Sequence, residues 1–140
     1  MAATTMKQMW THLQAYTFNQ KGEERAVNHL NEWGGYSKKI EMPVFTAWRD
    51  HTTFDKGAKT VTAVVSDKGW SSAVGVNNQE RWLEHAEKYN GGIAAFFVIH
   101  AADERAEPRK VKYIDDDAVF VGKIIRDGSE TRIVGQRRAL

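Results

Sequence analysis

The chain has 140 residues, of which 41% are hydrophobic and 27% charged, and it carries a formal net charge of +2. This size and balance predict one compact domain over residues 1–140. The chain has no cysteine, which excludes disulfides, thiolate metal sites and cysteine nucleophiles. No stretch approaches the roughly 18 apolar residues of a membrane span, and no secretory signal is evident, so we expect a cytoplasmic protein without a membrane partner.

Two helical segments are predicted near the N-terminus. Apolar residues recur at helical spacing over residues 6–17, after Thr4 and Thr5, either of which can serve as the N-cap. A second apolar face follows over residues 26–33, and the glycine pair 34–35 is expected to end it. Together these segments predict a bent helical arm.

The middle of the chain predicts strands. β-Branched and aromatic residues indicate a strand over residues 39–48, and Pro43 lacks a ladder donor, which places that strand at a sheet edge or a bulge. Residues 49–59 are polar and predict a loop. Alternation over residues 60–65, followed by a turn and the short run 72–76, predicts a hairpin.

The most regular helical pattern follows Asn77, which with Glu80 forms a capping arrangement, and it ends at the glycine pair 91–92. Residues 93–99 are continuously apolar, as expected for a central strand covered on both faces, and residues 73–99 suggest a strand, helix, strand crossover. Three late strands are expected over residues 109–114, 118–125 and 131–136, the last two joined through Asp127 and Gly128.

This order predicts an α/β (α+β) single domain, with a mixed β-sheet, an N-terminal helical arm and one central crossover helix packed on the sheet. Over residues 20–100, the order helix, three strands, helix, strand resembles the core of the PD-(D/E)xK nucleases. That resemblance implies an acid on one hairpin strand and an acid, any residue and a lysine on the next, which hold Mg²⁺ and orient a water. Residues 70–76 contain no acid and no lysine, so we expect that site to be missing.

Histidines and acidic runs give no metal site. None of the five histidines pairs with another at the three- or four-residue spacing of helical ligands. His100 ends the central strand, where ligands often bind, although a satisfied buried histidine is the commoner outcome. The run from Asp115 to Asp117 lacks the spacing of a calcium loop and predicts a solvated turn.

Aromatic residues beside polar loops give the strongest indication of function. Trp48 and Trp70 each lie next to cations, and with Phe54 and Tyr36 they can wall a pocket for a flat ligand. The alternative is that these rings only cover the ends of the core.

Basic residues would extend such a surface if they share one face. A strand edge protected by lysine and arginine explains the same residues equally well. The residues expected to contact nucleic acid, as stacking rings or as donors to phosphate and base edges, are Trp48, Arg49, His51, Lys59, Trp70, Arg109, Lys110, Arg132, Arg137 and Arg138.

We therefore expect a nucleic-acid-binding module that takes DNA or RNA, reads a base or modified base in an aromatic pocket, and uses no cofactor and no catalytic residue. A second hypothesis is a protein-interaction adaptor of a phage or defence system, in which the edge strand around Pro43 or an apolar helix face docks a protein partner or a second copy in a homodimer. The enzyme alternative is a divergent Mg²⁺-dependent nuclease that would use some of Glu24, Asp50, Asp55, Asp67 and Lys68.

Overall fold

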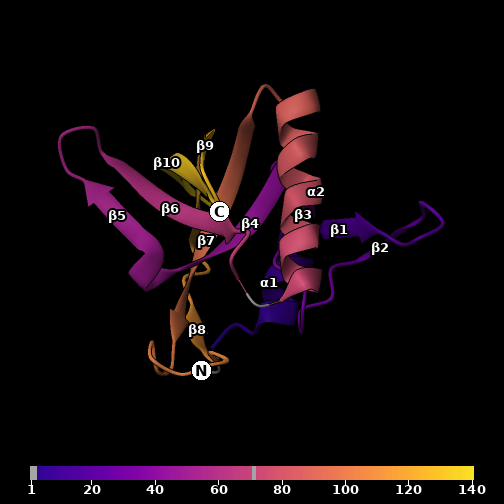
Figure 1. The fold of residues 1–140 in the computed structure, drawn as a ribbon, viewed down its shortest axis with the longest axis horizontal. Helices are drawn as coiled ribbons and strands as arrows, with labels where there is room; N and C mark the ends of the chain where they lie inside the picture. The colour runs from indigo at the N-terminus through magenta and orange to yellow at the C-terminus, as the bar shows by residue number, and fades with distance from the viewer. Residues whose placement is uncertain (1–2, 71) are drawn as a thin grey trace.

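The computed structural model describes residues 3–70 and 72–140 and shows one ten-stranded mixed sheet with two α-helices packed on it (Figure 1). The predicted α+β class is confirmed. The helices are α1 (Met6–His12) and α2 (Ala73–Tyr89), with a short 3₁₀ helix, η1 (Arg49–His51). The strands are β1 (Ala15–Phe18), β2 (Glu24–Ala26), β3 (Gly34–Ser37), β4 (Met42–Trp48), β5 (Thr52–Asp55), β6 (Thr60–Asp67), β7 (Ile93–Ala101), β8 (Val111–Ile114), β9 (Ala118–Asp127) and β10 (Glu130–Ala139).

The sheet runs in the order β2-β1-β3-β4-β7-β9-β10-β6-β5, with β8 beside β7. Its parallel pair is β4 with β7, in which Val44 lies opposite Ala95, and the other pairs are antiparallel. Strand β6 also contacts β4, although several strands separate them in the sheet. The half of the sheet from β4 to β6 therefore curls around one of its faces.

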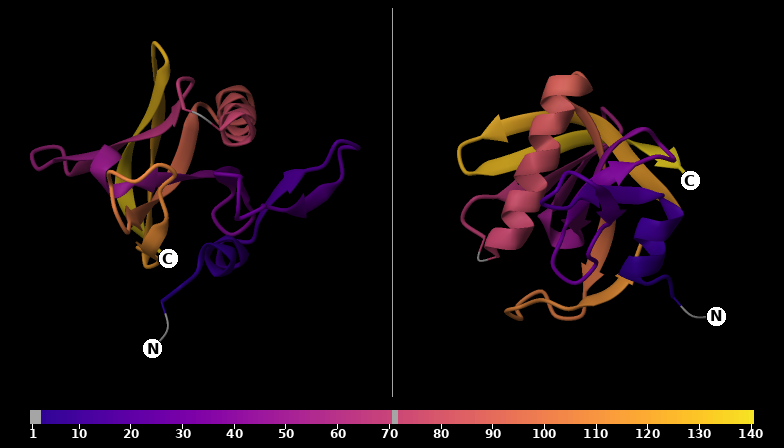
Figure 2. Two further views of the ribbon diagram at one scale, coloured as in Figure 1. Left: turned by 60° about the horizontal axis from the view of Figure 1, so that its bottom comes forward. Right: turned by 90° about the vertical axis from the view of Figure 1, so that its right-hand side faces the viewer.

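Two cores lie on opposite faces of β7, and the two helices cover different faces (Figure 2). Alternate β7 residues, such as Phe97, pack with Trp10 of α1 on one face, while Phe96 and its alternates pack with Trp82 of α2 on the other. This confirms the predicted central strand, because residues 94–99 are all buried. Neither α1 nor α2, the α-helices of the described residues, has the length and hydrophobicity needed to cross a bilayer.

The N-terminal helix is confirmed but is shorter than predicted. Thr5 caps α1, because its hydroxyl accepts from the Gln8 N–H at 3.1 Å and the Gln8 side chain accepts from the Thr5 N–H at 2.9 Å. The helix ends at His12, and Gln14 takes a left-handed conformation with φ of 52° that turns the chain into β1.

The second predicted helical segment is wrong: Ala26 ends β2, residues 27–33 form a loop with a turn at 29–31, and Leu30 is 81% exposed. The turn is held by the Glu32 carboxylate, which accepts from both terminal nitrogens of Arg25 (2.7 and 2.8 Å) and from the Asn28 N–H (2.7 Å). Residues 20–35, all of them described, therefore contain no helix, and the order that resembled the PD-(D/E)xK core is not formed there.

The glycine pair 34–35 lies inside β3 and does not end a helix. A Cβ at Gly34 would lie 2.8 Å from the Phe45 ring, and one at Gly35 would lie 2.6 Å from Val27. The glycines are needed because neighbouring side chains approach the β3 backbone closely.

Strand β4 is interior, which corrects the edge position inferred from Pro43. Pro43 lies opposite Tyr36 of β3 but one residue before Val44, where the pairing with β7 begins. Its missing N–H therefore falls outside the β4–β7 ladder.

The hairpin predicted across residues 60–76 is also wrong. Strand β6 pairs with β5 and β10, while residues 73–76 form the first turn of α2. The helix is capped by Ser72, whose hydroxyl accepts from the Gly75 N–H at 3.2 Å, and not by Asn77. Strand β5 lies in the segment predicted as a loop, whereas the three late strands form as predicted, with Gly128 at φ of 62° in the β9–β10 turn.

Asn78 fastens α2 to β3. Its side-chain oxygen accepts from the N–H groups of Trp33 (2.9 Å) and Gly34 (2.7 Å), and its side-chain nitrogen donates to the Gly34 carbonyl (2.9 Å). The residue is buried, so these backbone groups have little access to water in its place.

We expect Asn78→Ala to lower the free energy of unfolding by about 3 kcal/mol, because buried backbone groups would lose their partner. Urea unfolding followed by tryptophan fluorescence measures this. The matched control is Asn77→Ala, an exposed neighbour on the same helix, for which a change within about 0.5 kcal/mol is expected. Equal effects of the two substitutions would show that Asn78 does not hold the helix.

Candidate functional site

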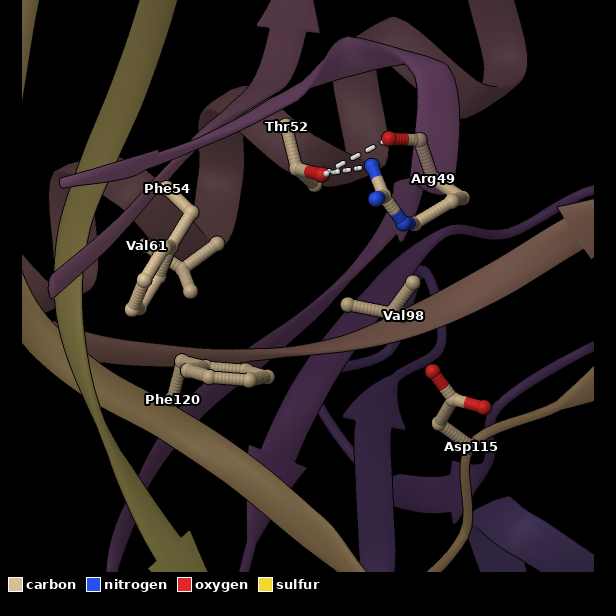
Figure 3. A pocket seen from close by; sticks show the side chains of 7 residues that line it. All are labelled: Arg49, Thr52, Phe54, Val61, Val98, Asp115 and Phe120. Atoms are coloured by element: carbon tan, nitrogen blue, oxygen red, sulfur yellow. Dashed lines mark hydrogen bonds between the residues drawn. The ribbon is translucent and has the colours of Figure 1, made fainter. Parts of the chain in front are cut away.

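A pocket of about 190 Å³ lies on the α2 face of the curled half of the sheet, beyond the end of β4 (Figure 3). Arg49 follows β4 directly, and Val98 lies near the carboxyl end of β7, the strand parallel to β4. The carboxyl ends of parallel strands are a common place for ligands. The lining residues are Arg49, Thr52, Phe54, Val61, Val98, Asp115 and Phe120.

Aromatic and aliphatic side chains form the base of this pocket. The Phe120 ring stacks on the buried Phe96 ring, with centroids 5.1 Å apart and planes 16° apart. Phe54 is 64% exposed and lies opposite Val61 in the β5–β6 ladder. Figure 3 shows Phe54 and Val61 along one side of the hollow and Phe120 beneath it. A flat apolar ring can therefore lie against Phe120.

Two charged side chains lie on the side of the hollow away from Phe54 (Figure 3). The Thr52 hydroxyl donates to the Arg49 carbonyl at 2.7 Å and accepts from the Arg49 guanidinium at 3.2 Å, which orients that guanidinium. The Asp115 N–H donates to the Val98 carbonyl at 3.0 Å, and Nε2 of His100 donates to the Asp115 carboxylate at 3.0 Å. The polar side of the pocket thus offers one guanidinium and one carboxylate in held positions.

An exposed aromatic residue extends this surface. The Tyr113 ring stacks on the His100 ring, with centroids 4.0 Å apart and planes 13° apart. Tyr113 is partly exposed on β8. A ring available for stacking therefore lies next to the residue that holds Asp115.

Several residues predicted from the sequence come together around η1, behind Arg49. Arg109 binds both oxygens of Asp50 at 2.6 Å, and its guanidinium lies 5.3 Å from the centre of the Trp48 ring. The His51 ring stacks on Trp70, with centroids 5.8 Å apart. These residues do not line the pocket. Their contacts hold η1 in place, and Arg49 is the first residue of η1.

The Asp50–Arg109 pair shifts both pKa values. The hydrogen bonds from Arg109 lower the pKa of Asp50 below its ordinary value, although partial burial acts in the opposite direction. The same hydrogen bonds raise the pKa of Arg109. The pair is therefore charged throughout the neutral range.

Tyr36, the fourth predicted wall residue, lies in a separate aromatic cluster between β1, β3 and α2. It packs against Tyr16 and Trp82, with centroids 5.5 and 6.1 Å apart, and against His85 at 5.7 Å. Burial lowers the pKa of His85. Of the four predicted wall residues, Phe54 alone lines the pocket.

The predicted basic residues divide into two groups. Arg132 lies between Asp127 and Glu130, and Arg109 binds Asp50, so carboxylates already neutralise both. Arg137 lies opposite Phe120 in the β9–β10 ladder, which places it on the pocket face, and it contacts Asp117 at 3.1 Å in an exposed pair. Lys59, Lys110 and Arg138 are exposed.

The acidic residues proposed for a nuclease lie in separate parts of the fold. Glu24 pairs with Lys38 near one end of the sheet, whereas Asp55 and Asp67 accept from the N–H groups of Ala58 and Gly69 in turns near the other end. Among residues 3–70 and 72–140, no three histidine or acidic side chains gather closely enough to hold a metal ion.

Most of the residues that line the pocket, including Thr52, Val98 and Phe120, are not predicted from the sequence. The feature of the sequence that could have indicated the site is a glycine within each of the late strands, Gly122 in β9 and Gly135 in β10. A Cβ at Gly135 would lie 2.9 Å from the Phe120 Cβ, and one at Gly122 would lie 1.7 Å from the Val134 carbonyl oxygen. Glycine within a strand pattern indicates such close approach.

We expect Arg109→Gln to lower the free energy of unfolding by about 1 kcal/mol at neutral pH. The lowered pKa of Asp50 means that this stabilisation is present above the ordinary aspartate range, near pH 4, and is lost as the pH falls through the folded-state value. Urea unfolding between pH 7 and 3 should therefore show the difference from the unmodified protein shrinking on acidification. Arg105→Gln, an exposed arginine of the same loop, is the control, and a pH-independent difference would contradict this assignment.

What the pocket can bind follows from the side chains that line it. Its floor is aromatic and apolar, and its polar side carries a guanidinium that donates hydrogen bonds and a carboxylate that accepts them. Comparisons of the chain with protein-family models, with curated proteins and with solved structures found no match.

Proposed function

We propose that the protein binds nucleic acid without cleaving it and holds one unpaired base in the pocket. The observation that carries this proposal is the combination of the stacked Phe120 ring with Arg49 and Asp115 on the polar side. A nucleobase has apolar faces and a polar edge, and a protein that takes up such a base stacks on the faces and hydrogen-bonds the edge.

Stacking is the main expected contribution to affinity. A base lying on Phe120 continues the stack that Phe96 and Phe120 already form. Phe54 adds an exposed apolar surface at the side of the pocket. Each base–aromatic contact of this kind contributes about 1–3 kcal/mol.

Cations near the pocket supply contacts for the phosphate backbone. Arg137 lies beside Phe120, and its pair with Asp117 leaves the two side chains 55% and 72% exposed. An exposed pair contributes little stability, so the guanidinium can turn to a phosphate at small cost. Arg138 lies opposite Val119 and so on the other face of the sheet, whereas Lys59 lies in the turn after β5, the strand that carries Phe54.

We expect Phe54→Ala to weaken binding of single-stranded DNA or RNA by about 5- to 100-fold, because a stacking surface is lost. Fluorescence anisotropy of labelled 12-mers at fixed salt measures this. Leu30→Ala is the matched control, since Leu30 is a large apolar side chain, 81% exposed, on a turn of the N-terminal part of the chain. Equal affinity for Phe54→Ala and the unmodified protein would reject the pocket as the binding site.

We expect Arg137→Gln to weaken binding of all sequences alike and to reduce the slope of log affinity against log salt by about one. A salt titration of the same anisotropy signal measures that slope. The control is Arg132→Gln, because Asp127 and Glu130 already hold this arginine. Loss of the labelled strand only when Mg²⁺ is added would favour the nuclease alternative, and an unchanged slope would remove Arg137 from the interface.

A further inference from the structure

We propose that the pocket selects cytosine among the bases, an inference that rests on the proposed nucleic-acid function. The juxtaposition that carries it is one carboxylate oxygen and one guanidinium on the same side of an apolar slot too small for most ligands. Each element of this pattern restricts the ring that can enter.

The Asp115 carboxylate has one oxygen that no described residue binds. Oδ2 of Asp115 accepts from Nε2 of His100 at 3.0 Å, and the other oxygen accepts no hydrogen bond from the described residues. The backbone of Asp115 is held by its N–H bond to the Val98 carbonyl, and His100 holds its Oδ2 atom. The Oδ1 atom can therefore accept from an N–H group of a ligand.

The guanidinium offers several donors. Thr52 takes one hydrogen bond from Nη1 of Arg49, and no ion pair between the described residues involves this arginine. Arginine presents five N–H donors in a planar fork, so two neighbouring acceptors of a ligand can be bound together. The polar side of the pocket thus places a carboxylate acceptor and a fork of guanidinium donors together.

The Watson–Crick edge of cytosine has the complementary order. Its 4-amino group is a donor, and the adjacent N3 and O2 are acceptors. Aspartate accepting from the cytosine amino group is an established pairing. In this orientation the C5 and C6 atoms of the ring point to the opposite side of the slot, where Phe54 and Val61 lie (Figure 3).

The other bases fit less well. Guanine can offer its two adjacent N–H donors to Asp115 and its O6 to Arg49, but it is a fused two-ring base and needs more room than cytosine. Thymine and uracil have one N–H between two carbonyls, so that a carbonyl oxygen would lie against the Asp115 carboxylate. The volume of about 190 Å³ is below the range of roughly 300–1,000 Å³ typical of ligand pockets and favours a single ring over a purine.

The test uses single-stranded DNA in which one central base is flanked by abasic positions, so that only this base can enter the pocket. The central base is cytosine, thymine or 2-pyrimidinone, which lacks only the 4-amino group of cytosine. We expect the unmodified protein to bind the cytosine strand about tenfold more tightly than either of the others. This comparison needs no variant.

Asp115→Asn then reverses the preference. The amide oxygen can still accept from His100, while the amide nitrogen donates to the O4 carbonyl of thymine. The control is Asp117→Asn, the same change two residues away at the exposed pair with Arg137. A cytosine preference that vanishes or inverts only in Asp115→Asn supports the inference.

The results distinguish failure of cytosine selection from failure of the proposed nucleic-acid binding. If all three strands bind equally and Phe54→Ala still weakens binding, base selection by Asp115 is wrong and the base pocket stands. If the unmodified protein binds none of the single strands, both proposals are wrong.

Discussion

Much of the architecture follows from the attachment of α2 to β3. Asn78 binds three backbone groups of residues 33–34, and Gly75 lets the helix approach so closely that a Cβ there would lie 2.6 Å from the Trp33 ring. A helix held at this spacing can cover only part of the curled sheet, and its apolar residues bury the Phe45 and Phe96 side of the core. The part beyond the helix is where the Phe120 pocket opens.

The pocket is built from segments that meet only in the folded chain. Arg49 lies in η1, directly after β4, Phe54 lies in β5, and Asp115 directly follows β8. The Arg109–Asp50 pair ties the loop before β8 to η1, so the carboxylate side and the guanidinium side of the site are linked by one ion pair. Rigid supports of this kind let a small site discriminate between ligands that differ by one hydrogen-bonding group.

Most of the arginines discussed above form ion pairs with carboxylates and do not make up a uniform basic face. Arg25, Arg109, Arg126 and Arg132 each bind carboxylates, and two of them bind more than one. Such pairs hold turns and strand ends in place. A ligand with a phosphate backbone would therefore meet a few exposed cations near the pocket, and the base would contribute a larger share of the binding free energy than it does on a strongly basic surface.

Local patterns predict the α+β class, an N-terminal helix capped by Thr4 or Thr5, the buried strand β7 and the β9–β10 hairpin, because periodicity and turn chemistry specify these elements. The sequence also identified Phe54 and Arg49 as candidates, but it assigned residues 26–33 to a helix and residues 72–76 to a strand. Those segments depend on contacts that a helical or strand period does not encode: the Arg25–Glu32 pair closes a turn, and Asn78 holds α2 against Gly34, which lies 44 residues earlier in the chain. The pocket could not be predicted from the sequence, because Phe120 is placed by strand pairing and by stacking on Phe96, and the Asp115 carboxylate is placed by His100.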